Sequence, residues 1–193
     1  MNLVSRITLL LSAILLGACS KTVQWEEEVP LNTGEVIWVK RYVTYKFETT
    51  QDNPFAFQYW PMGDQAISFK LKGRDYRFVG ANSLILLAVS PSNQQPVLME
   101  PRTWSRASDD PCVKPFYTQL VFSEGKQEWL PLPKVEPWLF NLPSNLMAHR
   151  GNLNDMQERY TSNDRQQKDQ TMTIQNPAMA RIDPSYQSEV CNK

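Results

Sequence analysis

The chain has 193 residues, and its 20 Lys and Arg side chains balance its 20 Asp and Glu side chains, which gives a formal net charge of +0. Nucleic-acid binding depends on a positive field, so this balance excludes a typical nucleic-acid binder and offers no polybasic patch to a membrane surface. The length suits one domain that buries a core of ordinary size.

Residues 1–18 have the three regions of a secretory signal peptide. Arg6 is the one charge of the first region, ITLLLSAILL (7–16) is almost wholly apolar, and the small pair Gly17-Ala18 follows. The apolar run is too short to span a bilayer, because a spanning helix needs about 20 apolar residues. We therefore predict a signal peptide over residues 1–18.

The four residues Leu16-Gly17-Ala18-Cys19 resemble the lipobox of bacterial lipoproteins. In that family the cysteine becomes the mature N-terminus, its thiol receives a diacylglyceryl group and its amine is usually acylated. The resemblance implies a covalent lipid on Cys19. No other cofactor and no metal are expected, because the sequence holds no motif for either. Two or more acyl chains anchor a protein stably, whereas one holds it only marginally.

Ser20 follows the cysteine, and a residue other than Asp at this place is similar to the pattern of Gram-negative lipoproteins sent to the outer membrane. The resemblance therefore implies an outer-membrane anchor, with the domain facing the periplasm or the outside. Glu26-Glu27-Glu28 comes shortly afterwards, and an acidic run so close to an anchor is typical of a solvated spacer. Residues 19–34 are predicted to be a lipidated N-terminus followed by this spacer.

Residues 35–150 are predicted to form an antiparallel β domain. The first strand is EVIWVKRYVTYKF (35–47), which is rich in β-branched and aromatic residues. Its odd-numbered residues form a buried face that only Arg41 interrupts, and Trp38 on the other face is also expected to fill the core. Next, ISFKLKGRDYRF (67–78) predicts a hairpin with a two-residue turn at Gly73-Arg74. In that register Leu71 faces Tyr76, and the apolar residues share one face.

Further short strands follow without helices between them. LILLAV (84–89) is a continuous apolar run, typical of a strand covered on both faces, and residues 97–99 are its predicted partner. Residues 116–122 and 127–130 predict another hairpin. Short strands at this spacing indicate a mainly β fold, an antiparallel β-sandwich or a barrel-like domain.

Residues 151–193 are predicted to hold a short helix and a polar tail. Asn152 is a candidate N-cap for a helix over residues 153–160, and residues 161–178 are too polar to form a core. Once Cys19 is lipidated, Cys112 and Cys191 remain, and an even pair in an oxidising compartment predicts a disulfide. This bridge would tether the tail to the β domain; the alternative is two free buried thiols.

The search for catalytic motifs is mostly negative. His149 is the one histidine of the chain, it follows no metal or triad pattern, and it is predicted to be a surface or packing residue. Phosphate loops and nucleophile elbows do not occur in the sequence either. Paired carboxylates remain a third hypothesis, an envelope hydrolase, because glycoside hydrolysis needs no histidine.

Aromatic residues beside polar ones give a better indication of function. Tyr59-Trp60 follows NPFAFQ, and Trp104 lies between Arg102 and Arg106. Exposed aromatic and arginine side chains stack on sugars or anchor protein partners, so these five residues are candidate ligand or partner contacts. The alternative is that these tryptophans fill the core.

Two segments, EEEVPLNTGEVIWVKR (26–41) and EPWLFNLPSNLMAHR (136–150), resemble uncharacterised proteobacterial envelope lipoproteins. The resemblance implies no site residues. The resulting prediction is a non-enzymatic binding or assembly component of the cell envelope, held in the outer membrane by its lipid. Its partner would be an envelope protein or, as the alternative, a glycan such as peptidoglycan or a surface polysaccharide.

Overall fold

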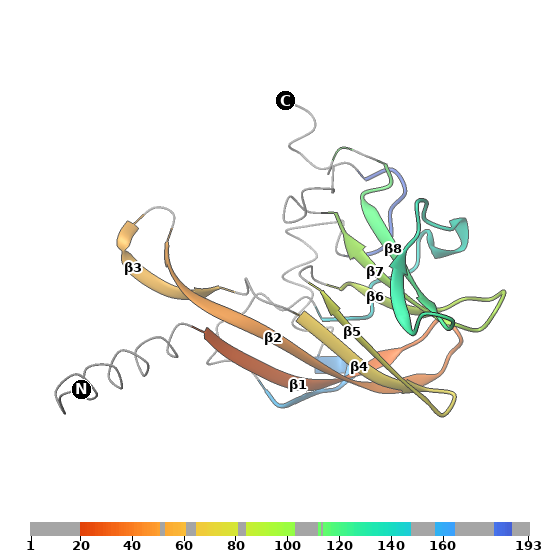
Figure 1. Ribbon diagram of the computed structural model, residues 1–193, viewed down its shortest axis with the longest axis horizontal. Coiled ribbons are helices and arrows are strands. Elements are labelled where there is room, and N and C mark those ends of the chain that lie inside the picture. The colour runs from red at the N-terminus through yellow and green to blue at the C-terminus, as the bar shows by residue number, and fades with distance from the viewer. Residues whose placement is uncertain are drawn as a thin grey trace, which may run out of the picture.

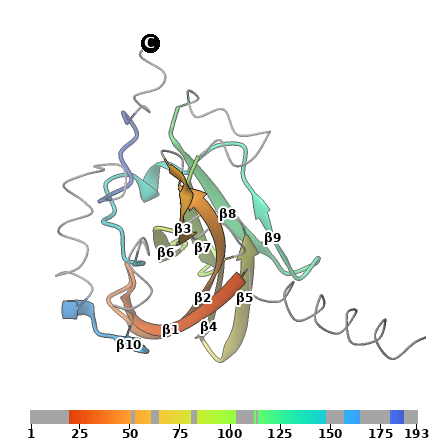
Figure 2. The ribbon, with the colours of Figure 1, turned by 90° about the vertical axis from the view of Figure 1, so that its left-hand side faces the viewer.

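A computed structural model describes residues 20–50, 53–60, 65–80, 84–102, 112, 114–147, 157–164 and 180–186. Within these residues the chain is mainly β, and its strands form two sheets that pack face to face as a sandwich (Figures 1 and 2). The predicted fold class is confirmed in its sandwich form, since the sheets do not close into a barrel.

The first sheet has six strands, and a long central strand organises it. Strand β2 pairs with β1 on one side, and with β4 and then β3 on the other. These pairings are antiparallel, whereas the two-residue strand β10 runs parallel to β1 at the edge. The order along the sheet is β10-β1-β2-β4-β5. The bounds are β1 Ser20–Pro30, β2 Val36–Thr50, β3 Asn53–Trp60, β4 Gln65–Leu71, β5 Arg74–Gly80 and β10 Arg159–Tyr160.

The second sheet has four antiparallel strands in chain order, as the sequence predicts for this region. They are β6 Leu86–Val89, β7 Pro96–Pro101, β8 Tyr117–Ser123 and β9 Glu128–Pro131. One face of this sheet packs against the first sheet, and the other is covered by the 3-10 helix η2 (Pro137–Leu139) and its neighbours. Strand β6 is accordingly buried along its whole length.

The β4–β5 hairpin is confirmed, but the predicted register is wrong by two residues. The turn residues are Lys72 and Gly73, with φ of 50° and 80°, and Phe69 rather than Leu71 lies opposite Tyr76. Two consecutive residues in the left-handed region form the kind of turn whose twist matches that of the flanking strands. A shift of two residues leaves every side chain on its original face, so the face pattern cannot detect it.

The prediction of an acidic spacer before residue 35 is wrong for the residues that the structure describes. Ser20–Pro30 forms strand β1, and Glu27 in its middle is fully buried. Alternation along the strand explains this result, because Glu27 shares a face with Trp25 and Val29 while Glu26 and Glu28 point to the other side. The β domain therefore begins at Ser20.

The prediction of a helix over residues 153–160 is wrong at its C-terminal end. Arg159–Tyr160 forms strand β10, and a short helix follows at residues 162–164. The backbone N–H of Glu26 donates to the carbonyl of Glu158, 2.8 Å away, and the Tyr160 ring is buried beside Tyr45. Burying this ring against β1 outweighs local helix propensity. Residues 151–156 and 165–179 lie outside the described part.

Part of the predicted tail belongs to the domain. The carbonyl of Leu142 accepts a hydrogen bond from Ile182 N–H at 3.0 Å. Ile182 and Tyr186 pack on the face of the second sheet that is turned away from the first sheet. The Tyr117 hydroxyl donates to the Arg181 carbonyl at 3.1 Å. Cys112 is disulfide-bonded. Cys191 lies outside the described residues, so its pairing with Cys112 stays a prediction.

Two asparagine side chains protect the outer edge of β6. Asn145 accepts a hydrogen bond from Leu87 N–H at 2.8 Å, and its amide donates to the carbonyls of Leu87 and Pro30 at 2.7 and 2.8 Å. Asn32 accepts from Val89 N–H and donates to the Val89 carbonyl. Edge strands expose unpaired backbone groups that can pair with another chain and cause aggregation. The two asparagine side chains form hydrogen bonds with such groups on β6.

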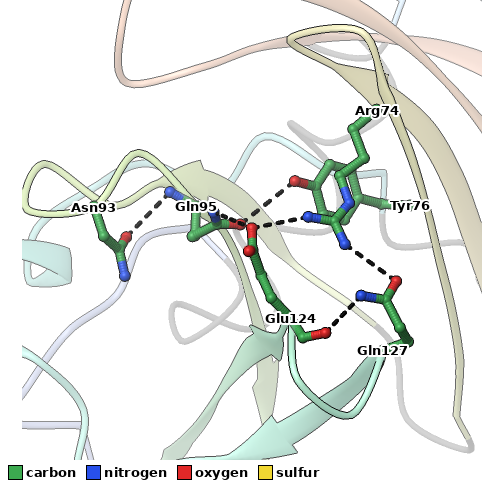
Figure 3. A network of polar contacts seen from close by, with 6 residues as sticks. All are labelled: Arg74, Tyr76, Asn93, Gln95, Glu124 and Gln127. Carbon is green, nitrogen blue, oxygen red and sulfur yellow. Dashed lines mark hydrogen bonds and ion pairs between the residues drawn. The ribbon is translucent and has the colours of Figure 1, made fainter.

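A polar network ties strand β5 to two hairpin turns of the second sheet at one end of the sandwich, hereafter the closed end (Figure 3). Glu124, in the β8–β9 turn, accepts hydrogen bonds from Arg74 of β5 and from Gln95 of the β6–β7 turn, each at 2.8 Å. Gln95 also accepts from the Tyr76 hydroxyl, and Arg74 donates to Gln127. Since Arg74 belongs to the first sheet and the turns to the second, the network fixes one sheet on the other.

Alkaline pH is expected to weaken the fold through two buried tyrosines. Burial raises the pKa of Tyr117 and that of Tyr45 from 10.0 to about 12 each. Above pH 10 the unfolded chain loses these protons while the folded chain keeps them, so stability is full below about pH 10 and falls as pH rises to about 12. Unfolding curves across this range, read with tyrosinate absorbance, measure the effect. A free energy of unfolding that stays constant there would contradict it.

Candidate binding surface

The inner face of β2 changes character along the strand. Ile37 and Val39 lie in the core between the sheets, and Val43 and Tyr45 belong to a smaller cluster with Trp25, Met147 and Tyr160. Arg41 lies between these two apolar groups. Each of these β2 residues follows the previous one by two positions, so the 15-residue strand presents one continuous inner face.

Arg41 forms a buried ion pair with Glu27 on this face. Their side chains are 2% and 0% exposed, and a guanidinium nitrogen lies 2.8 Å from Glu27 Oε1. The other carboxylate oxygen accepts a hydrogen bond from Met147 N–H at 3.0 Å, and the guanidinium carbon lies 5.4 Å from the centre of the Trp25 ring. Both charges are paired and closed off from solvent, so loss of one partner would leave the other charge buried without compensation, and the pair does not form an accessible site.

The opposite face of the first sheet, hereafter the outer face, carries aromatic rings paired with arginines. The Arg159 guanidinium carbon lies 3.8 Å from the centre of the Trp38 ring, and that of Arg77 lies 5.9 Å from the Tyr42 ring. Arg77 also donates to the Tyr42 hydroxyl at 3.2 Å. Such cation–π contacts hold an exposed ring in one orientation. The Cα atoms of Trp38 and Tyr42 lie about 13 Å apart along β2.

The prediction that Trp38 fills the core is wrong, because this side chain is 37% exposed on the outer face. Val36 and Val79 on the same face are 55% and 46% exposed. Glu26 lies between two cations, with Lys40 Nζ at 3.6 Å and Arg159 Nε at 3.8 Å. The outer face therefore combines exposed apolar groups with charges of both signs.

The carboxylates of the triple-glutamate run are held in different ways. Glu26 and Glu28 share the outer face, about 7 Å apart along the strand, whereas Glu27 is buried on the inner face. Glu28 accepts a hydrogen bond from Ser162 N–H at 3.0 Å. These carboxylates bind cations and backbone donors of the protein itself.

The five predicted contact residues are not brought together by any described interaction. Tyr59 lies in β3, 37% exposed, with its ring centre 5.0 Å from that of Phe47. Trp60 occupies the register position opposite Lys46, and nothing of its side chain is described. Arg102 follows β7, where its N–H donates to the Phe116 carbonyl at 2.8 Å. Trp104 and Arg106 lie outside the described residues, as do Cys19 and His149.

Sequence reasoning missed Tyr42, Arg77 and Arg159 as members of an exposed surface. The alternation of β2 holds a partial signal, since its even-numbered residues combine Val36, Trp38 and Tyr42 with Lys40 and Lys46. No local pattern could bring Arg159 to Trp38, because that contact depends on the pairing of β10 with β1.

Among the described residues, no three His, Cys, Asp or Glu side chains gather as a metal site would require. No helix in the described part of the chain has the length and apolar character to cross a bilayer. No protein-family model, curated protein or solved structure matches this chain.

Proposed function

We propose that this protein is an outer-membrane lipoprotein, anchored through Cys19, that works without catalysis as a binding or assembly component of the cell envelope. The observation that carries the proposal is the lipobox followed at once by a folded domain, since β1 begins at Ser20. An acylated cysteine at this place would hold the first sheet directly at the membrane.

The outer face is the proposed contact surface for an envelope protein partner. Its composition supports this role, because Trp, Tyr and Arg are the side chains most enriched among those that dominate binding energy. Trp38 and Tyr42 are each ordered by an arginine, so binding would cost little further side-chain entropy.

A glycan ligand is the second candidate, and it rests on the same two rings. Aromatic rings exposed on this sheet offer apolar faces on which sugar rings stack, with Arg77 and Lys40 nearby as hydrogen-bond donors. A pull-down with insoluble peptidoglycan separates the two candidates. The protein would sediment with the peptidoglycan if its ligand is this glycan, and would stay in the supernatant if its partner is a protein.

Cys19→Ser tests the anchor. The variant is expected to lose lipid labelling and to leave the membrane fraction as soluble or unprocessed protein, because the leader that remains is too short to span a bilayer. Membrane fractionation with alkaline and high-salt washes measures the change. If the variant stays in the washed membranes, the lipobox is not what anchors the protein.

Crosslinking in intact cells tests the outer face. Adducts of the wild-type protein are expected to decrease strongly in the Trp38→Ala variant, whereas Lys126→Ala, an exposed change in the β8–β9 turn, should leave them unchanged. Equal adducts in both variants would contradict a role of the outer face. Mass spectrometry of the adducts identifies the partner.

A further inference from the structure

The far end of β2 extends past the second sheet as a two-stranded arm (Figure 1). The arm consists of residues 46–50 of β2 and strand β3, and Phe47 lies opposite Tyr59 in their antiparallel register. The two rings are 42% and 37% exposed, with centres 5.0 Å apart. Val43 and Tyr45, just before them on the same face, are each 1% exposed. The apolar inner face therefore continues beyond the part of the domain that covers it.

The base of the arm lies beside the proposed lipid anchor. Ser20, the first residue of β1, is paired with Lys46, the residue before Phe47. Cys19 is one residue from Ser20, so chain geometry alone limits the distance between the Cα atoms of Cys19 and Phe47 to about 13 Å. The start of β1 and the arm lie at the same end of the molecule, opposite the β4–β5 turn (Figure 1).

A bilayer surface fits this end of the molecule. A diacylglyceryl cysteine would lie in the headgroup layer, which is roughly 5–7 Å thick on each side of the hydrocarbon core. Since β1 starts directly after Cys19, no linker would let the domain move away from that layer. Aromatic rings favour this interface, and the exposed cation Lys21, which shares the inner face with Tyr45 and Phe47, would face the phosphates of anionic lipids.

We propose that the arm lies in the bilayer interface, with the Phe47–Tyr59 pair in contact with lipid. This inference rests on the lipid anchor of the proposed function and adds an orientation to it. Two points of attachment, the acyl chains and the aromatic pair, would fix how the domain stands on the membrane. The closed end, with its turns joined through Glu124, would then point away from the bilayer.

Photocrosslinking of the full-length lipidated protein tests the contact. The protein is reconstituted into vesicles of phosphatidylethanolamine and phosphatidylglycerol, with Phe47→benzoylphenylalanine as the probe. Val36→benzoylphenylalanine is the matched control, since Val36 is 55% exposed on the same strand. Position 47 should give at least about tenfold more phospholipid adduct than position 36, because about 35 Å of strand separates them. Tyr59→benzoylphenylalanine repeats the measurement from the second ring.

The outcomes separate this inference from the proposed function. If the protein floats with the vesicles but positions 47 and 36 give equal phospholipid adducts, the arm does not contact lipid and only the anchor stands. Adducts at position 47 that join two copies of the chain also overturn the inference, because the arm would then be a protein interface. If the wild-type protein does not float with the vesicles, the anchor itself fails and both proposals fall.

Discussion

Glu27→Gln is expected to lower the free energy of unfolding by about 3–5 kcal/mol, because it leaves the charge of Arg41 buried without its partner. The amide of glutamine has nearly the shape of the carboxylate, so the loss would come from charge rather than packing. Both side chains are at most 2% exposed, and solvent cannot replace the lost interaction. Denaturation of the mature protein by urea measures the change.

The neighbouring residue supplies the control. Glu26→Gln removes an exposed carboxylate whose two cation contacts measure 3.6 and 3.8 Å, and we expect it to cost less than about 1 kcal/mol. A double variant, Glu27→Leu with Arg41→Met, should recover much of the loss, since no charge then remains buried. If Glu27→Gln costs no more than Glu26→Gln, Arg41 does not depend on Glu27 for compensation of its charge.

Asn145→Ala is expected to cost about 3 kcal/mol or more, because two buried backbone groups and one half-buried group lose their hydrogen bonds at once. They are the N–H and carbonyl of Leu87 and the carbonyl of Pro30, which belong to different sheets. Asn145 is 5% exposed, so water has little access to replace the amide. Thermal and urea unfolding measure the loss.

Asn145→Asp sharpens this prediction. A carboxylate still accepts from Leu87 N–H but has no hydrogen to donate to the two carbonyls, so a comparable loss is expected at neutral pH. Asn32→Ala is the control, because Asn32 makes the same kind of contact to Val89 from an exposed position. A loss at Asn145 no larger than at Asn32 would contradict the account of the β6 edge.

Alternation and apolar runs predicted most of the strands, because burial on one face or both imposes those patterns directly. Strand β1 shows where the reasoning failed: three consecutive glutamates suggested a spacer, although Trp25 and Val29 on either side of Glu27 indicate a buried face. The register of β4 and β5 failed for another reason. A slip of two residues preserves both faces, so only the backbone angles of Lys72 and Gly73 decide it.

The outer face could be predicted only in part. The residues of β2 on this face follow from alternation, but their arginine partners come from β5 and β10, which reach β2 through tertiary pairing. Sequence also gave no sign that Asn145 would contact Pro30, since an asparagine in a loop has many possible partners. Long-range side-chain contacts of this kind depend on the whole fold.

The pairing of β10 with β1 also affects how the chain reaches its native state. Glu28 contacts Ser162, and Asn145 contacts Pro30, at sequence separations of 134 and 115 residues. A ribosome releases the N-terminal strand first, so β1 must wait for most of the chain before its edge and its buried charge are covered. Folding rate falls as such non-local contacts come to dominate. We therefore expect the first sheet to be completed only after residues 157–162 have been synthesised, since β10 and Ser162 must be present to cover the edge of β1.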